Sequence, residues 1–380
     1  MGSLGSLSHK KILDVLSEAH YTVPGYLVFA RNTTLFAQRF DVGSLNLLGE
    51  AVPIAADASE QNNILRSGFA VSQAGQLVYA SYGSAADIEL IVTDRSGKEL
   101  SALMTGNFGA LRLSPDGQKV AVAEYDMRNG GGTIWIQDLR SNIRTRFTFG
   151  GGMNLGPTWS PDGLQISFAS NRDGAFNVYA KPVTGAVEEK VLHVSPEDER
   201  PVSWSADGRF LVIDSRLRSR QNSQEVSILP LAGDGKPYSY LNAPYVNSGG
   251  QLSPDGRSLA YTSEESGRPE VYVTSFPQAK GKWQISSTGG HTPRWRHDGR
   301  ELFFCRTDGI LMTAEVTAGK DSFASGVVKP LSERRVFQNL FTASYDVFPD
   351  GQRFIMSAIR PEVVHAPLTL VTNWTAELKK

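Results

Sequence analysis

The stretch Trp159-Ser-Pro-Asp-Gly-Leu-Gln-Ile166-Ser-Phe168 decides the fold of this chain. Pro presets φ for the second position of a type I turn, Asp can bond back to the local backbone, and Gly accepts a positive φ. After the turn, Ile166 and Phe168 alternate with polar residues, which is the period of a β-strand, and Trp159 ends the segment before it. The stretch therefore predicts a tight β-hairpin.

The same turn recurs along the whole chain, as Ser-Pro-Asp-Gly three times and as variants elsewhere. Successive closing glycines lie 42 to 52 residues apart, which is the length of one four-stranded propeller blade. An apolar residue stands four positions before every closing glycine, and the third and fifth positions after the six Asp-Gly turns are apolar. The closing glycines are Gly25, Gly75, Gly117, Gly163, Gly208, Gly256, Gly299 and Gly351.

These repeats predict an all-β fold, a single closed β-propeller of four-stranded blades. Each blade has apolar residues on both faces, and stacking the blades around an axis buries them. The eight turns predict eight blades, with seven as the alternative if the degenerate first repeat pairs differently. The expected organisation is a flexible segment at 1–9, the propeller at 10–375 and a C-terminal tail at 376–380.

Closure of the ring is expected to use an N-terminal strand. The last repeat supplies about three strands, from 345–358 and 368–374, so the segment Lys10–Val15 could complete its blade from the other end of the chain. The alternative for this segment is a short helix on the surface of the protein.

Composition narrows the classes of partner. Lys plus Arg is 38 and Asp plus Glu is 39, so the basic excess typical of proteins that bind nucleic acid or membrane surfaces is missing. The lone Cys305 excludes an intrachain disulfide. No apolar run is long enough to span a bilayer, and the first ten residues lack the order of a signal peptide. We expect a monomer that binds an unknown protein, a peptide or a small ligand, in a compartment that composition leaves open.

The motifs of catalysis are missing from the sequence. The run Gly150–Gly156 lacks the Lys-Ser/Thr of a phosphate-binding loop, and no Gly-x-Ser-x-Gly elbow occurs. The six histidines show no metal-ligand spacing, so no metal or other cofactor is expected, and a Ca²⁺ ion in the channel has no motif to support it. The prediction is a protein that is not an enzyme.

The run Trp159–Gly163 with Ile166–Gly174 resembles the WD-like propeller repeats of the TolB group. The segments Gly25–Arg31 with Leu35–Phe40, Gly249–Gly256, and Lys282–Ser286 with Pro293–Leu302 are similar to the C-terminal propeller of bacterial transmembrane serine/threonine kinases. The resemblance extends over about residues 10–375 and implies a sensor or interaction domain of a bacterial signalling protein, in the periplasm or outside the cell. The sequence itself contains no kinase motif.

The loops that enter the innermost strands of a propeller form the mouth of its channel, where ligands usually bind. In this chain these loops mix amide, guanidinium and imidazole groups, which suit recognition. The candidate ligand or peptide contacts are Asn154, Arg200, Asn247 and His291. The predicted function is a non-catalytic module for ligand sensing or protein–protein interaction. The alternative is a hydrolase or lyase with a metal-dependent site at the channel mouth.

Overall fold

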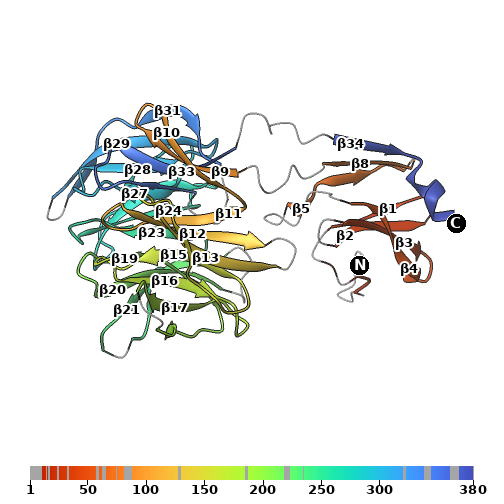
Figure 1. The fold of residues 1–380 in the computed structure, drawn as a ribbon, viewed down its shortest axis with the longest axis horizontal. Helices are drawn as coiled ribbons and strands as arrows, with labels where there is room; N and C mark the ends of the chain where they lie inside the picture. The colour runs from red at the N-terminus through yellow and green to blue at the C-terminus, as the bar shows by residue number, and fades with distance from the viewer. Residues whose placement is uncertain are drawn as a thin grey trace. The chain divides into compact units, whose positions relative to one another are not determined.

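The computed structural model describes residues 11–13, 15, 18–23, 25–31, 34–56, 60–61, 66–73, 75–80, 88–126, 130–184, 187–217, 223–233, 235–319, 322–337, 344–359 and 368–379. These fall into two compact units, 1–85 with 361–380 and 86–360, where the sequence predicted one propeller across 10–375 (Figure 1). The predicted flexible segment 1–9 lies outside the described residues.

The described residues of 86–360 form six sheets, each of antiparallel strands. Five of them take their strands from consecutive segments of the chain. They are β11 (Phe108–Leu113), β12 (Lys119–Asp126), β13 (Gly131–Asp138) and β14 (Arg144–Arg146); β15 (Asn154–Trp159), β16 (Gln165–Ser170), β17 (Asn177–Pro182) and β18 (Lys190–His193); β19 (Asp198–Trp204), β20 (Phe210–Arg216), β21 (Gln224–Pro230) and β22 (Tyr238–Leu241); β23 (Asn247–Leu252), β24 (Ser258–Ser263), β25 (Glu270–Ser275) and β26 (Trp283–Gln284); β27 (His291–Trp295), β28 (Glu301–Cys305), β29 (Ile310–Ala318), β30 (Phe323–Ser325) and β31 (Lys329–Arg335).

The sixth sheet joins the two ends of this unit. Its order is β10 (Glu99–Thr105), β9 (Ile88–Asp94), β33 (Arg353–Ile359) and β32 (Tyr345–Val347). The pairing of β33 with β9 is antiparallel and runs without a bulge from Arg353↔Asp94 to Ile359↔Ile88.

The repeated turns have the predicted geometry. In the hairpin between β15 and β16, the amide of Gly163 donates to the carbonyl of Ser160 at 2.9 Å, and Gly163 has φ +71°. The Ser160 hydroxyl also accepts from the amide of Gln165 at 2.9 Å, which closes the loop against the next strand. The turns ending at Gly117 and Gly256 repeat this pattern, so the local prediction is confirmed.

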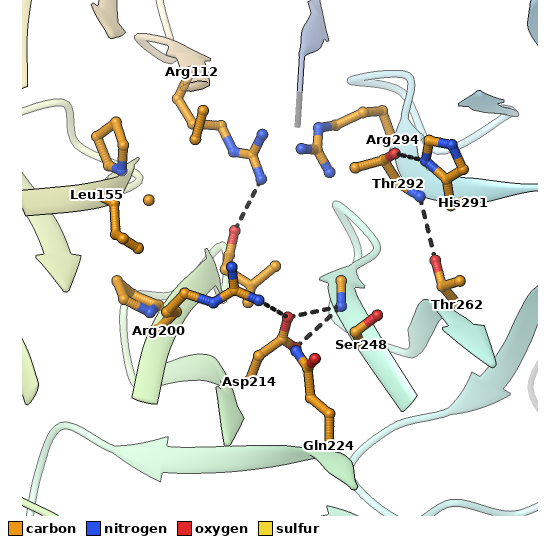
Figure 2. A pocket seen from close by; sticks show the side chains of 16 residues that line it. Arg112, Leu155, Arg200, Asp214, Gln224, Ser248, Thr262, His291, Thr292 and Arg294 are labelled. Carbon is orange, nitrogen blue, oxygen red and sulfur yellow. Dashed lines mark hydrogen bonds and ion pairs between the residues drawn. The ribbon is translucent and has the colours of Figure 1, made fainter. Parts of the chain in front are cut away.

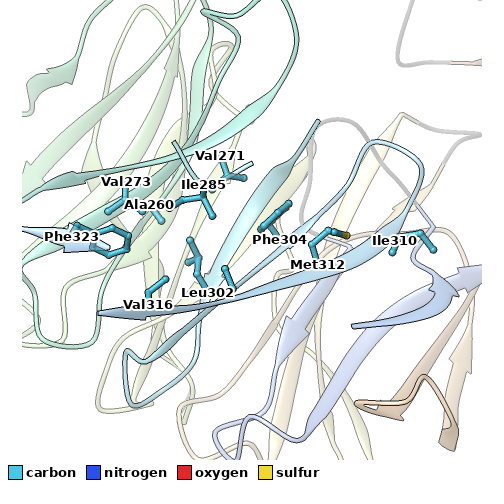
Figure 3. Close-up of a cluster of buried hydrophobic side chains, with 11 residues drawn as sticks. Ala260, Val271, Val273, Ile285, Leu302, Phe304, Ile310, Met312, Val316 and Phe323 are labelled. Atoms are coloured by element: carbon cyan, nitrogen blue, oxygen red, sulfur yellow. The ribbon is translucent and has the colours of Figure 1, made fainter. Parts of the chain in front are cut away.

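Hydrophobic clusters join each sheet to the next. Figure 3 shows one of them, in which Leu302, Phe304 and Met312 of β28 and β29 lie against Ala260 and Val271 of β24 and β25. Five equivalent clusters lie among the described residues of this unit, each shared by two sheets. They contain Leu90 and Leu111, Ile134 and Ile166, Val178 and Leu211, Val226 and Leu259, and Phe303 and Phe354.

The other unit contains the first two repeats. Its described residues form the sheet β1 (Ala19–Thr22), β2 (Tyr26–Arg31), β3 (Thr34–Asp41) and β4 (Asn46–Ala55), and the sheet β34 (Leu368–Thr372), β8 (Gln76–Ala80) and β7 (Phe69–Val71). The short strands β5 (Glu60–Gln61) and β6 (Arg66–Ser67) pair with each other, and a 3₁₀ helix, η3, covers Trp374–Lys379. Trp374 is buried with Val28, Phe69 and Leu77.

Two repeats have exchanged their third strands. In most repeats the third strand follows the second along the chain, but β8 pairs with β34, and β33 pairs with β9. The sequence placed 368–374 in the last repeat, whereas Thr369 lies opposite Tyr79 of the second repeat. A period-two apolar pattern determines which face of a strand is buried and leaves its partner open, so the sequence could not reveal this exchange.

The exchange alters the predicted closure of the ring. Lys11, Ile12, Leu13 and Val15 lie outside any strand, and the three apolar side chains pack near Leu27, Phe29 and Phe40 of the first repeat. The N-terminal strand predicted at Lys10–Val15 is therefore not found among the described residues. A count of eight blades in one ring is likewise not confirmed, because the first two repeats form a separate compact unit.

Candidate functional site

A cavity of about 110 Å³ lies among the innermost strands of unit 86–360 (Figure 2). Its wall is built from β11, β15, β19, β23 and β27, with side chains from the second and third strands behind them. The lining residues are Ala110, Arg112, Leu155, Gly156, Pro157, Arg200, Pro201, Val202, Asp214, Gln224, Ser248, Gly249, Thr262, His291, Thr292 and Arg294.

One position of the repeat supplies much of the polar chemistry. The fifth residue before each closing glycine in this unit is Arg112, Thr158, Ser203, Gln251, Arg294 or Asp346. Three of these side chains converge on the carbonyl oxygen of Val202, which accepts from Thr158 Oγ1 at 3.2 Å, Gln251 Nε2 at 3.1 Å and Arg112 Nη2 at 3.4 Å. Because they come from three different sheets, this position faces a common centre.

Arg294 is the most buried charged side chain of the cavity wall. The residue is 4% exposed, and its Nη1 donates to the carbonyl of Pro293 at 2.7 Å. Its Nε lies 3.4 Å from Asp346 Oδ1, but neither Nε nor Nη2 has a hydrogen-bond partner within the described part of the chain. Burial lowers the pKa of Arg294, and the carboxylate of Asp346 opposes this shift. A buried donor without a partner is costly.

Arg112 adds a second guanidinium to the same space. Burial, and then the neighbouring positive charge of Arg294, lower the pKa of Arg112 to about 9, so the side chain stays protonated at neutral pH. Nearby, the two oxygens of Asp346 are held by backbone amides: Leu113 N donates to Oδ2 at 2.9 Å and Val347 N to Oδ1 at 3.0 Å.

On the opposite wall, Asp214 and Arg200 form a wide ion pair with 3.9 Å between Nη2 and Oδ2. Both carboxylate oxygens of Asp214 also accept from the amide of Gly249, at 3.0 and 3.1 Å. Burial raises the pKa of Asp214 to about 6, against the opposing charge of Arg200. This carboxyl group is ionised at pH 7 and takes up a proton just below that pH.

His291 and Thr292 complete the wall. Burial lowers the pKa of His291 to about 4, so the ring is neutral at physiological pH. Its Nδ1 contacts Thr292 Oγ1 at 2.5 Å, and its Nε2 has no partner among the described residues. Thr292 has φ +53°, whereas the equivalent residues of two other repeats are Gly156 and Gly249. A strained residue of this kind costs about 1–3 kcal/mol and tends to lie at functional sites.

Comparison with known proteins finds similarity to TolB propellers. A family model described as TolB beta propeller domain matches residues 58–238. The structure of putative TolB from Agrobacterium tumefaciens superposes with a TM-score of 0.55 at 16% identity, over 72% of this chain and 99% of that one. Residues 58–238 are thus similar to a TolB β-propeller domain.

Two curated relatives match parts of this TolB-like chain. The uncharacterized protein Atu1656 of Agrobacterium fabrum is 29% identical over 39% of the chain and 52% of its own length. The uncharacterized peptidase YuxL of Bacillus subtilis is 26% identical over 43% of the chain and 31% of its own length. The chain thus spans about half or less of these relatives. None of these matches concerns a kinase, so the link to a kinase sensor stays a prediction.

The structure brings two of the four predicted contact residues of this TolB-like propeller into the cavity, Arg200 and His291. Asn154 lies outside its lining, where its Nδ2 donates to Gly132 O and its Oδ1 accepts from Arg172, each at 2.9 Å. Asn247 also lies outside the lining, and its Nδ2 donates weakly to Leu241 O at 3.5 Å. Both asparagines are buried at the start of their strands and tie neighbouring segments together.

Sequence reasoning missed Arg112, Arg294 and Asp214, although signals for them existed. The two arginines occupy the fifth position before the closing glycine, next to the apolar residue used to find the repeat. Asp214 stands six residues after a closing glycine, where the other Asp-Gly repeats have small side chains: Ala123, Ala169, Thr262, Cys305 and Ser357. A charged side chain at a position where the other repeats have small residues indicates a role in the site.

The described residues contain neither a cluster of metal ligands nor a membrane-spanning helix. Within them, no three His, Cys, Asp or Glu side chains gather as metal ligands. No helix in the same residues has the length and apolar character needed to span a bilayer.

Proposed function

We propose that this TolB-like propeller is a non-catalytic binding module and that a partner inserts a group into the axial cavity of unit 86–360. The observation that carries the proposal is the convergence of three arginines on one small cavity, one of them with unpaired buried donors. Fixed donors of this kind are suited to recognising a ligand.

The proposal includes a six-bladed ring for this unit. Neighbouring sheets share hydrophobic clusters in the order of the chain, and the clusters around Phe303 and Leu90 both contain residues of the sheet that joins β9 to β33. Pairing of strands from the two ends of a propeller is an efficient way to close its ring, because it leaves no terminal blade uncovered. Such a ring would hold the cavity wall rigid.

The histidine of the cavity argues against imidazole-based acid–base catalysis at neutral pH. His291 is the imidazole in the wall, and a group with a pKa of about 4 is a weak base at pH 7. The name of the relative YuxL as a peptidase keeps an enzymatic role as the alternative to test.

A steric block tests the proposal. Ser248 lines the cavity, and Ser248→Trp would fill it, whereas Ser266→Trp places the same side chain on an exposed turn and serves as the matched control. Affinity capture from a bacterial lysate, followed by direct titration of each captured protein, should yield a partner that binds the wild type and the control but not Ser248→Trp. Equal binding of every partner by a folded Ser248→Trp variant would overturn the proposal.

The enzymatic alternative needs a separate measurement. Purified chain is assayed with fluorogenic peptide and ester substrates, with and without added Zn²⁺ or Ca²⁺. The binding-module proposal expects no turnover under either condition. Turnover that disappears in Ser248→Trp and persists in Ser266→Trp would establish catalysis in the cavity instead.

A further inference from the structure

The guanidinium groups of Arg112 and Arg294 point toward the same space in the cavity (Figure 2). We infer that this space is a binding site for one carboxylate group, supplied by the C-terminus of a peptide or by a small organic acid. The inference rests on the proposed binding function and names the chemical class of its ligand.

The first argument is the unpaired donors. Arg294 Nε and Nη2 are buried and lack hydrogen-bond partners within the described residues, and the side chain is 5% exposed. A guanidinium presents its N–H groups in a planar fork that matches the two oxygens of a carboxylate. A carboxylate in the cavity would accept hydrogen bonds from donors that have no hydrogen-bond partner among the described residues.

The second argument is the charge of the wall. Arg112, Arg200 and Arg294 contribute three positive charges, and Asp214 and Asp346 contribute two negative charges at pH 7. The oxygens of both carboxylates already accept from backbone amides, so these groups are fixed parts of the wall. One positive charge remains in excess, which complements a monoanion better than a dianion such as phosphate.

The third argument is size. A cavity of about 110 Å³ has room for several water molecules. A carboxylate with one or two attached carbon atoms fits this space. The neutral His291 ring, with its unpartnered Nε2, offers a further polar contact in the wall.

Isothermal titration calorimetry of the wild-type chain tests the ligand class directly. The probes are N-acetyl-triglycine with a free carboxylate, the same peptide ending in an amide, sodium acetate and sodium phosphate, all at constant ionic strength. The free-carboxylate peptide should bind at least about tenfold more tightly than its amide, because charge-assisted hydrogen bonds are lost in the amide. Acetate binding as tightly as the peptide would indicate a small acid, and weaker acetate binding would indicate a chain end.

Three results would overturn the inference: equal binding of amide and carboxylate peptides, tighter binding of phosphate than of either carboxylate probe, or no detectable carboxylate binding. These leave the binding-module proposal standing if Ser248→Trp still abolishes partner capture. The two ideas therefore fail separately.

Variants locate the site. Arg294→Gln should weaken binding of the carboxylate peptide by about tenfold or more, and Arg112→Gln should weaken it by a smaller factor. Arg209→Gln is the matched control, because the Arg209 side chain is 71% exposed and pairs with Asp207 on a turn; its affinity should stay within about twofold. Folded Arg294→Gln and Arg112→Gln variants with wild-type affinity would contradict the assignment, and circular dichroism and thermal unfolding establish that they fold.

Discussion

The hairpin turns and the cavity of unit 86–360 place aspartate side chains in opposite environments. At the turn, the hydroxyl of Ser160 and the amide of Leu164 hold the pKa of Asp162 below its usual range. In the cavity, burial raises the pKa of Asp214 to about 6. The polar groups of the turn are hydrogen-bonded to one another within a few residues, whereas Arg294 in the cavity has two nitrogens without a hydrogen-bond partner in the described part of the chain.

This difference indicates that the turns contribute to stability and the cavity to recognition of a ligand. A turn whose polar groups are satisfied locally lowers the free energy of the folded state wherever it occurs, so it can be repeated. A buried group that lacks a partner costs stability and persists where a ligand can supply the partner. Substitutions in the turns should therefore change unfolding and spare binding, and substitutions in the cavity should change binding more than unfolding.

The largest effect on stability should come from a turn glycine. Gly117 has φ +67°, and a Cβ there would lie 2.8 Å from Cδ of Pro349. Gly117→Ala should lower the free energy of unfolding by about 2–3 kcal/mol, from backbone strain together with the clash. Denaturant unfolding measures this, and affinity for the carboxylate peptide should not change.

Gly256→Ala is the control for the clash. Gly256 has the same φ of +67°, but nothing lies within 4 Å of an added Cβ. Its cost should be about 1 kcal/mol, from strain alone. Equal losses at Gly117 and Gly256 would mean that the contact between neighbouring turns has no energetic weight.

A smaller effect, this time on binding, should follow pH. Because the pKa of Asp214 is raised to about 6, this carboxyl is ionised at pH 7 and protonated at pH 5. Protonation of Asp214 makes the net charge of the cavity wall more positive by one unit. The remaining charges of the wall are those of Arg112, Arg200, Arg294 and Asp346. Affinity for the carboxylate peptide should therefore increase about three- to tenfold as pH falls from about 7 to 5.

Asp214→Asn sharpens the pH test. The ring of His291 stays neutral down to a pKa of about 4, and a peptide carboxylate stays ionised at pH 5. The variant should therefore bind more tightly than the wild type at pH 7 and show a flat profile down to pH 5. A wild-type slope that survives in Asp214→Asn would assign the titration to another group.

The same raised pKa sets a second, linked expectation for stability. Because the pKa of Asp214 is raised in the folded state, binding of a proton to this carboxyl stabilises the fold. This stabilisation is complete below about pH 4 and is lost as pH rises through about 6. Thermal unfolding of the wild type and Asp214→Asn between these pH values measures the difference.

The smallest effect should come from Thr292→Gly. Thr292 has φ +53° at a position where two other repeats have Gly156 and Gly249. Glycine would relieve the strain but increase the entropy of the unfolded chain, so the free energy of unfolding should change by less than about 1 kcal/mol. A loss above about 2 kcal/mol, measured by denaturant unfolding, would show that the Thr292 side chain supports the wall.

Much of the fold follows from short-range patterns. The turn that ends at Gly163 forms its bonds within six residues, and Ile166 and Phe168 are both fully buried as the alternation predicts. The candidate site was harder to predict. Arg200 and His291 line the cavity. Asn154 and Asn247, which were also chosen because they lie in loops entering the inner strands, are buried and donate hydrogen bonds to neighbouring segments instead. Their position at the start of an inner strand does not determine which way each side chain faces.

The sequence by itself determined that this chain is built from repeated β-hairpins, because a Pro-Asp-Gly turn and two alternating strands depend on neighbours along the chain. Tertiary structure alone decided that β9 pairs with β33 and β34 with β8. It also decided that arginines from distant repeats share one cavity with Asp214. Strand partners and the burial of charges depend on which sheets pack together, and a period-two pattern is compatible with many such arrangements.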